Sequence, residues 1–273
     1  MQIFTTCVII IIILWAIVGF LLNGRKDHED WETLKKYRYA HRGLHDKPVI
    51  PENSMEAFRR AVEQGYGAEL DVHLMKDGSL AVIHDSSLKR TAGADVRIED
   101  LTKEDLEQYR LEGTEERIPL LKDVLRLFRG KTPLIIELKP EGGNHDALAK
   151  AVADLMRSYP GIWCVESFDP RVVRWFNRNY SEVCRGQLAA NFFKDRDSDL
   201  SLPVKLVLTN LLTNFLTWPD FVAYRYSDCR TPALWFCRKR CKMQIIHWTL
   251  TTPKQLAAAE KRDALVIFEN FMP

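Results

Sequence analysis

From residue 37 to the C-terminus, short apolar runs alternate with amphipathic stretches. Most of these runs are about four to six residues long, which is typical of strands buried on both faces of a parallel sheet. Eight runs are predicted to be strands: residues 38–43, 68–72, 133–139, 163–168, 185–189, 205–209, 244–250 and 264–268.

The stretches between these runs repeat their apolar residues with helical spacing. Helices are predicted at residues 54–64, 120–128, 145–158 and 170–179. Ser54 begins the first of them and is a favourable N-cap residue. Strand–helix alternation repeated about eight times predicts an α/β fold, a TIM (β/α)8 barrel, as one domain over residues 37–273.

A hairpin interrupts this alternation. Residues 69–75 and 80–85 are extended runs on either side of an Asp77-Gly78 pair, which is a strong signal for a two-residue turn. With Asp77-Gly78 as the turn, a residue on one strand pairs with the residue on the other strand for which the two numbers sum to about 155. Asp71 is then predicted to face His84 on one side of the ribbon.

The N-terminal segment has a different pattern, because residues 3–22 contain no charged side chain. About twenty apolar residues in a helix span the hydrocarbon core of a bilayer. A cleaved signal peptide would have Lys or Arg before this core and small residues at a cleavage site after it, and the sequence has neither. An uncleaved anchor at residues 1–22 is therefore favoured, with a juxtamembrane linker at residues 23–36.

The charges beside this segment predict its orientation. Arg25, Lys26, Lys35, Lys36 and Arg38 all follow it, whereas residues 1–7 contain no Lys or Arg. Because Lys and Arg concentrate on the cytoplasmic side of a span, a single-pass membrane protein with a cytoplasmic domain is predicted. The whole chain has 39 basic and 37 acidic residues, so it lacks the basic excess of a nucleic-acid-binding protein.

Polar residues gather where the predicted strands end, which is the end of a TIM barrel that carries the active site. They are His41 and Arg42 on the first strand, Glu69 and Asp71 on the second, His84 on the hairpin, and Glu137 and Lys139 on the third. Converging carboxylates repel one another unless a cation binds them, and Ca²⁺ or Mg²⁺ prefers oxygen ligands.

The remaining residues of this group suit proton transfer and anion binding. His41 and His84 titrate near neutrality, as an acid and a base must. Arg42 and Lys139 supply fixed positive charge for a phosphate, although Lys139 and Glu137 also fit a purely structural ion pair. The group as a whole predicts metal-dependent cleavage of a phosphodiester.

Several short motifs follow one another along the chain. They are His41-Arg42-Gly43, Pro51-Glu52-Asn53-Ser54, Glu69-Leu70-Asp71-Val72, His84-Asp85, Ile118-Pro119-Leu120, Glu137-Leu138-Lys139, Ser167-Phe168 and Trp248-Thr249. In this order and spacing they resemble the glycerophosphodiester phosphodiesterase family, from about residue 38 to the C-terminus.

The resemblance implies a role for each matching residue. The implied metal ligands are Glu69, Asp71 and Glu137, the acid–base pair is His41 and His84, the phosphate contacts are Arg42 and Lys139, and Glu52 supports the substrate site. Trp248 fits either stacking on the glycerol or head group or packing at the barrel mouth. Many relatives end the last strand with Thr-Asp, where this chain has Phe268-Glu269-Asn270, which leaves the details of substrate recognition open.

Members of this family hydrolyse glycerophosphodiesters to glycerol 3-phosphate and an alcohol. The resemblance implies a small substrate of the glycerophosphocholine or glycerophosphoethanolamine type, attacked by water or by the neighbouring glycerol hydroxyl. A lysophospholipase D, which performs the same chemistry on a one-chain lipid, stays open because of the predicted anchor. A non-catalytic barrel that binds lipid head groups is disfavoured, since every expected catalytic position is filled.

Overall fold

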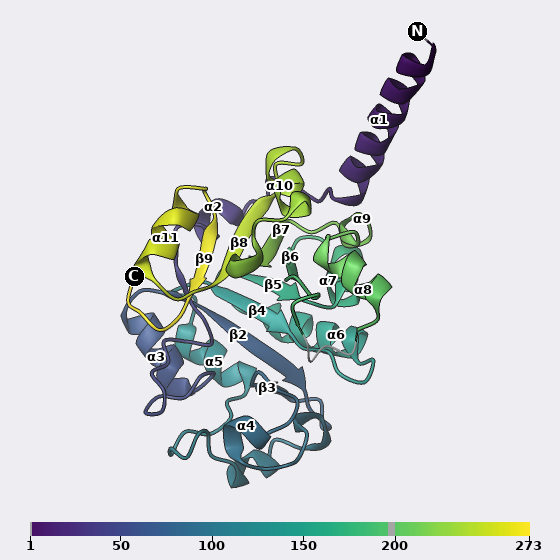
Figure 1. Cartoon of the computed structure of the whole chain (residues 1–273). Coiled ribbons are helices and arrows are strands. Elements are labelled where there is room, and N and C mark those ends of the chain that lie inside the picture. Colours follow the sequence, from purple (N-terminus) through teal and green to yellow (C-terminus); the bar gives the residue numbers. More distant parts are fainter. Residues whose placement is uncertain (1, 196–199) are drawn as a thin grey trace.

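The computed structural model describes residues 2–195 and 200–273, and it shows a barrel from which one helix extends (Figure 1). In this part of the chain eight parallel strands form a closed ring, and β3 (Leu80–Val82) pairs antiparallel with β2. The ring consists of β1 (Tyr39–Ala40), β2 (Gly67–Leu74), β4 (Leu134–Leu138), β5 (Trp163–Ser167), β6 (Cys184–Ala189), β7 (Phe221–Arg225), β8 (Gln244–Leu250) and β9 (Leu265–Phe268). Because β1 pairs with both β2 and β9, the predicted TIM barrel is confirmed.

Helices surround this ring. They are α3 (Met55–Glu63), α5 (Leu121–Phe128), α6 (His145–Met156), α7 (Pro170–Asn179), α8 (Leu202–Thr209), α9 (Asn214–Thr217), α10 (Pro232–Lys239) and α11 (Pro253–Glu260). Shorter turns are α2 (Trp31–Leu34), α4 (Lys89–Ala92), η1 (Ile98–Asp100), η2 (Asp105–Gln108) and η3 (Tyr226–Asp228). The four predicted helices are confirmed, and the Ser54 side chain accepts a hydrogen bond from the Ala57 N–H at 3.1 Å.

One end of the barrel is closed by α2. Trp31 and Leu34 are buried in the same apolar cluster as Ile135 and Ile246 from the strands. The Tyr39 hydroxyl at the start of β1 donates a hydrogen bond to the Leu34 carbonyl at 2.9 Å. Part of the segment predicted as a linker therefore packs against the barrel.

The predicted strand at residues 205–209 is wrong. These residues form most of α8, and the barrel strand at this place is β7, which pairs with β6 and β8. A short apolar run fits a helix or a strand equally well when only its apolar pattern is considered. Ser201 before α8 and Pro203 in its first turn are the local features that favour a helix.

The predicted hairpin register is also wrong, by one residue. Val72 pairs with Val82, and Leu74 pairs with Leu80. The turn is longer than predicted, because the N–H of Met75 donates to the Ser79 carbonyl and Gly78 adopts a left-handed φ of 84°. A three-residue loop that ends in such a glycine shifts the pairing by one position.

α1 (Gln2–Leu21) extends away from the barrel (Figure 1). It is long and apolar enough to cross a membrane, and its segment Phe4–Leu21 has a mean hydropathy of 2.8 with none of it buried against the domain. Its half next to the barrel contacts α10. There the ring of Trp15 lies 5.3 Å from that of Phe236 on α10.

Candidate active site

The carboxyl ends of the barrel strands surround a cavity of about 230 Å³. Its lining residues are His41, Arg42, Glu69, His84, Glu137, Lys139, Glu166, Phe168, Leu188, Arg225, Trp248 and Ile267. The structure therefore brings together predicted residues from five separate segments. Asp71 and Glu52 do not line the cavity and lie behind it, in contact with Arg42.

Three carboxylates form a cluster at this site, with Glu69 and Glu137 at the cavity and Asp71 behind them. Glu69 and Asp71 lie on β2, and Glu137 on β4 is the register partner of Asp71. Each contributes an oxygen to a group whose atoms all lie within 4.8 Å of one another, and all three side chains are buried. Glu69 Oε1 has no hydrogen-bond partner among the residues that the structure describes. This donor set fits a hard divalent cation.

Burial and mutual repulsion set the charge of these carboxylates. Burial, followed by the charges of Asp71 and Glu137, raises the pKa of Glu69 well above its ordinary value. Burial also raises the pKa of Glu137, although Lys139 opposes it with Nζ 2.6 Å from Glu137 Oε1. For Asp71 burial is outweighed by Lys139 and other positive groups, so its pKa is lowered. A cation would relieve the repulsion that remains.

Arg42 connects the carboxylate cluster to the loop before α3. It has a left-handed φ of 54°, and its backbone N–H donates to Glu69 Oε2 at 3.0 Å. Its guanidinium donates to Glu52 Oε1 at 2.8 Å and lies 3.3 Å from Asp71 Oδ2. Asn53 donates to the same Asp71 oxygen at 2.8 Å. Asn53 was part of a recognised motif but had no predicted role, and the structure shows it holding Asp71 in place.

Glu52 is the centre of a buried ionic network. Its carboxylate accepts hydrogen bonds from Arg42, Lys47 and Arg90, the last at 2.7 Å. Burial opposes the ionisation of Glu52, but these three cations outweigh it and lower its pKa to about 2. Glu52 therefore stays ionised and fixes the position of Arg42 at the cavity.

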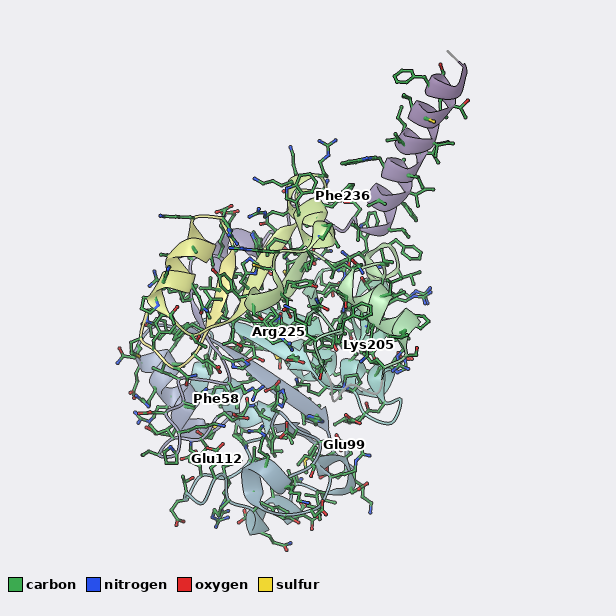
Figure 2. All side chains as sticks on the ribbon, viewed as in Figure 1. Phe58, Glu99, Glu112, Lys205, Arg225 and Phe236 are labelled. Carbon is green, nitrogen blue, oxygen red and sulfur yellow. The ribbon has the colours of Figure 1, made fainter. Side chains whose placement is uncertain are left out.

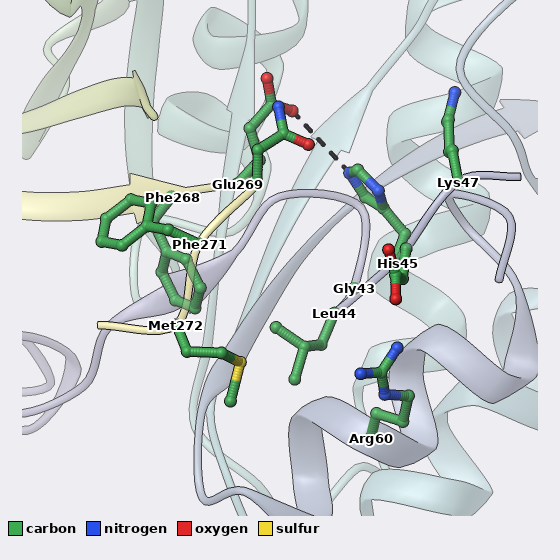
Figure 3. A pocket seen from close by; sticks show the side chains of 11 residues that line it. Gly43, Leu44, His45, Lys47, Arg60, Phe268, Glu269, Phe271 and Met272 are labelled. Atoms are coloured by element: carbon green, nitrogen blue, oxygen red, sulfur yellow. Dashed lines mark ion pairs between the residues drawn. The ribbon is translucent and has the colours of Figure 1, made fainter. Parts of the chain in front are cut away.

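His41 is oriented by Glu269, the residue that follows β9. His41 Nδ1 lies 2.7 Å from Glu269 Oε2, and Nε2 lies 3.9 Å from Glu69 Oε2. The same Glu269 oxygen lies 3.8 Å from His45 across an adjacent pocket (Figure 3). Burial lowers the pKa of His41 even though Glu269 raises it, so the ring is neutral at pH 7. When Nδ1 donates to Glu269, Nε2 carries the free lone pair.

His84 reaches the cavity although the predicted hairpin register is wrong. The chain leaves β3 after Val82, so the side of the ribbon no longer decides where His84 points. Its Nδ1 is hydrogen-bonded to Asp85, which in turn accepts from Arg90 Nε. His73 supports it from behind, with Nε2 3.1 Å from the His84 carbonyl. Asp85 therefore orients His84 much as Glu269 orients His41.

Two charged residues of the cavity were not predicted from the sequence. Glu166 on β5 is the register partner of Glu137, is 2% exposed, and has a pKa raised chiefly by burial. An acidic residue within the apolar run of residues 163–168 was the available signal. Arg225 ends β7 and lies among the strand ends, where Figure 2 labels it. It was missed because β7 itself was missed.

The side of the cavity opposite the carboxylates is aromatic. The rings of Phe168 and Trp248 meet edge to face at 5.6 Å, and Phe192 meets Phe168 at 5.9 Å. The Arg225 guanidinium lies 5.1 Å from the centre of the Trp248 ring. Lys139 lies 5.9 Å from the Phe168 ring and so borders both sides. Trp248 thus both packs at the barrel mouth and presents a surface to the cavity.

A closed barrel with paired histidines beside a carboxylate cluster is the arrangement of a hydrolytic site. The model of the Glycerophosphoryl diester phosphodiesterase family matches residues 41–266. The chain belongs to this family.

Individual relatives agree with this assignment. Lysophospholipase D GDPD1 of Homo sapiens is 35% identical over 167 residues, which cover 55% of this chain and 49% of that protein. A glycerophosphodiester phosphodiesterase of Caldanaerobacter subterraneus is 40% identical over 133 residues, covering 44% of this chain and 54% of that protein. The matched stretch thus spans about half the length of these curated relatives.

Solved structures show the same fold. A phosphodiesterase of Oleispira antarctica, in complex with the product sn-glycerol-3-phosphate, superposes with a TM-score of 0.69 at 20% identity and covers 85% of this chain and 92% of its own. A glycerophosphodiester phosphodiesterase of Thermotoga maritima has a TM-score of 0.64 at 26% identity, with coverage of 85% and 94%.

Proposed function

We propose that this protein hydrolyses glycerophosphodiesters to sn-glycerol 3-phosphate and an alcohol, with the help of a divalent cation. The observation that carries the proposal is the cluster of Glu69, Asp71 and Glu137 at a cavity that two oriented histidines also line. The product bound by the Oleispira antarctica phosphodiesterase supports the choice of substrate class.

The carboxylate group is the proposed cation site. Its oxygens suit Ca²⁺ or Mg²⁺, and the unpartnered Glu69 Oε1 is a ligand atom that the protein itself leaves without a hydrogen bond. When bound, the cation supplies positive charge that polarises a phosphate oxygen. Arg42 and Lys139, which line the cavity next to these carboxylates, are the proposed phosphate contacts.

The two histidines are assigned the proton transfers. Burial lowers the pKa of His41 and its Nδ1 is hydrogen-bonded to Glu269, so Nε2 is the proposed acceptor of the proton from the nucleophile. His84, oriented by Asp85, is placed to give a proton to the oxygen of the leaving alcohol. The nucleophile is water or the neighbouring glycerol hydroxyl, and the hydroxyl would pass through a cyclic phosphate.

Trp248 and Arg225 are proposed to contact the part of the substrate beyond the phosphate. They lie together on the aromatic side of the cavity, away from the carboxylates. An indole face suits a glycerol or a quaternary ammonium head group. Arg225 adds a positive charge. Among the residues that the structure describes, its one ion-pair partner is Asp228, at 3.8 Å.

Lysophospholipase D activity is the second candidate. It is favoured by the apolar lining formed by Phe168, Leu188 and Ile267, and by the similarity to the human lysophospholipase D. We also propose that α1 anchors the protein in a membrane with the barrel on the cytoplasmic side, on the basis of its apolar length and the Lys and Arg residues after it. An anchored enzyme would meet a lipid substrate at the bilayer surface.

The test uses the full chain in neutral detergent with three substrates. Glycerophosphocholine, glycerophosphoethanolamine and lysophosphatidylcholine are supplied separately with Ca²⁺ or Mg²⁺, and glycerol 3-phosphate and choline are measured. Release of glycerol 3-phosphate from the first two supports the main proposal. Choline release from the lysolipid alone supports lysophospholipase D activity instead. If none of the three substrates is cleaved, both proposed activities are contradicted.

A further inference from the structure

A second large pocket lies outside the barrel, between α10, the segment that follows α11 and the outer face of β8. Its volume is about 400 Å³. It shares no residue with the catalytic cavity. Three arginines, Arg230, Arg238 and Arg262, line it together with the buried His247 on β8. The pocket is therefore strongly positive and separate from the chemistry described above.

These arginines have no acidic partner in the part of the chain that the structure describes. Among residues 2–195 and 200–273, none of the three lies within ion-pair distance of a carboxylate, and the Arg262 guanidinium donates to the sulfur of Cys229 at 3.7 Å. Arg230 and Arg262 are exposed at the pocket and Arg238 is half-buried, so all three guanidinium groups are accessible to a ligand. Unpaired guanidinium groups around one pocket are suited to an oxyanion, above all a phosphate.

His247 lines the pocket and is affected by the positive charges of these arginines. Its Nδ1 lies 3.2 Å from the Tyr224 carbonyl, and the side chain is 2% exposed. Burial first, and then the charges of Arg262 and Arg238, lower its pKa to about 4. The start of α10 also borders the pocket through Thr231, so the positive end of that helix faces the same space.

The location of the pocket indicates where its anion comes from. The same helix, α10, packs against α1: Phe236, labelled in Figure 2, lies 5.3 Å from Trp15, and the Cys237 thiol lies 3.5 Å from the Leu22 carbonyl. Trp235 on the pocket rim is 50% exposed, as an indole at a membrane interface would be. α10 thus contacts the end of the apolar helix through Phe236 and Cys237 and lines the pocket through Trp235 and Arg238.

We propose that this pocket binds the phosphate of an anionic lipid head group in the membrane that α1 enters. The proposal rests on α1 as the membrane segment and not on the catalytic assignment. Lipid binding would hold the barrel in one orientation on the bilayer. A free phosphate has the same chemistry, so the experiment separates the two sources.

The experiment measures binding by isothermal titration calorimetry on the full chain in neutral-detergent micelles. The probes are micelles that contain phosphatidic acid, micelles that contain phosphatidylcholine, and inorganic phosphate. The test variant is Arg238→Gln with Arg262→Gln. The matched control is Lys239→Gln with Lys254→Gln, because these lysines are exposed on α10 and α11 outside the pocket.

The expected result is saturable binding of phosphatidic acid that weakens at least about tenfold in the arginine variant, since charged hydrogen bonds are lost. The lysine control should bind within about twofold of the unchanged protein, because exposed charges contribute little. Equal loss in both variants, no binding of phosphatidic acid, or equal binding of phosphatidylcholine overturns the proposal. Inorganic phosphate binding as tightly as phosphatidic acid overturns the lipid assignment.

Turnover of glycerophosphocholine is measured on the same samples. Both variants should keep it, because their residues lie outside the catalytic cavity. Loss of lipid binding with retained turnover separates this pocket from the active site. Unchanged melting temperatures show that the arginine variant is folded.

Discussion

The two sides of the barrel mouth are held together by different forces. On the side of β1, β2 and β4, each polar group is fixed by at least one charged neighbour, as Lys139 is between Asp71 and Glu137. On the side of β7 and β8 the contacts are aromatic, and Arg225 rests on the ring of Trp248. The difference suggests a division of work, in which the ionic side is rigid and reacts with the phosphate while the aromatic side recognises what is attached to it.

The largest effect is expected on the ionic side, from His41→Ala and from His84→Ala. Each should lower kcat by about 10²–10⁴-fold, the usual contribution of a general acid or base. Both histidines are only partly buried at the cavity, so the melting temperature should change little. Glycerol 3-phosphate release and thermal unfolding are measured together. Full activity in either variant removes that histidine from the mechanism.

The next effect is expected from Glu269→Gln, which keeps the shape but removes the charge beside His41. The carboxylate raises the pKa of His41, so its loss should move the acidic limb of the kcat/KM profile to lower pH. We expect kcat to fall by about 10–100-fold, as for other residues that orient a reacting side chain. Glu269→Asp serves as the control and should restore part of the rate. An unshifted profile would show that Glu269 does not act through His41.

A smaller effect is expected on the aromatic side. Trp248→Leu and Arg225→Gln should each raise KM by about 2–10-fold with little change in kcat, because a cation–π or stacking contact contributes about 0.5–1.5 kcal/mol. The change should differ between glycerophosphocholine and glycerophosphoethanolamine. A large fall in kcat with an unchanged KM would contradict the proposed division between the two sides.

The smallest effect concerns stability and comes from Glu52. Its pKa is lowered from an ordinary 4.5 to about 2, so its ionised form stabilises the fold above about pH 5, and this stabilisation is lost as the pH falls towards 2. Glu52→Gln should lower Tm by several degrees at pH 7 and by less at pH 3, at about 2–4 °C per kcal/mol. Thermal scans from pH 7 to pH 3 check this. A Tm difference that is independent of pH would contradict the ionic role.

The two sides of the mouth also differ in how well the sequence predicts them. The ionic residues were found because each stands at the end of a strand with a clear apolar pattern, as Glu69 and Glu137 do. Arg225 was not found, because the apolar residues of α8 match a strand as well as a helix and drew the prediction away from β7. Pattern alone cannot decide such short runs.

Other features depended on contacts that no local pattern contains. The hairpin register followed from the left-handed Gly78, which turns a two-residue loop into a three-residue one. The pairing of Glu269 with His41 joins residues at opposite ends of the domain, and only barrel closure brings them together. What appeared in the sequence as a departure from the family pattern is, in the structure, the residue that orients the proposed base.

The central claim is that three buried carboxylates bind a cation that glycerophosphodiester cleavage requires. The most direct measurement follows glycerol 3-phosphate release from glycerophosphocholine by the full chain, with Ca²⁺ or Mg²⁺ and then with excess chelator, together with cation binding by the unchanged protein and by Glu69→Gln. The account predicts release that stops with chelator and returns with metal, and cation affinity at least about a hundredfold weaker in the variant. Release that continues in chelator, or unchanged cation binding by Glu69→Gln, would contradict it.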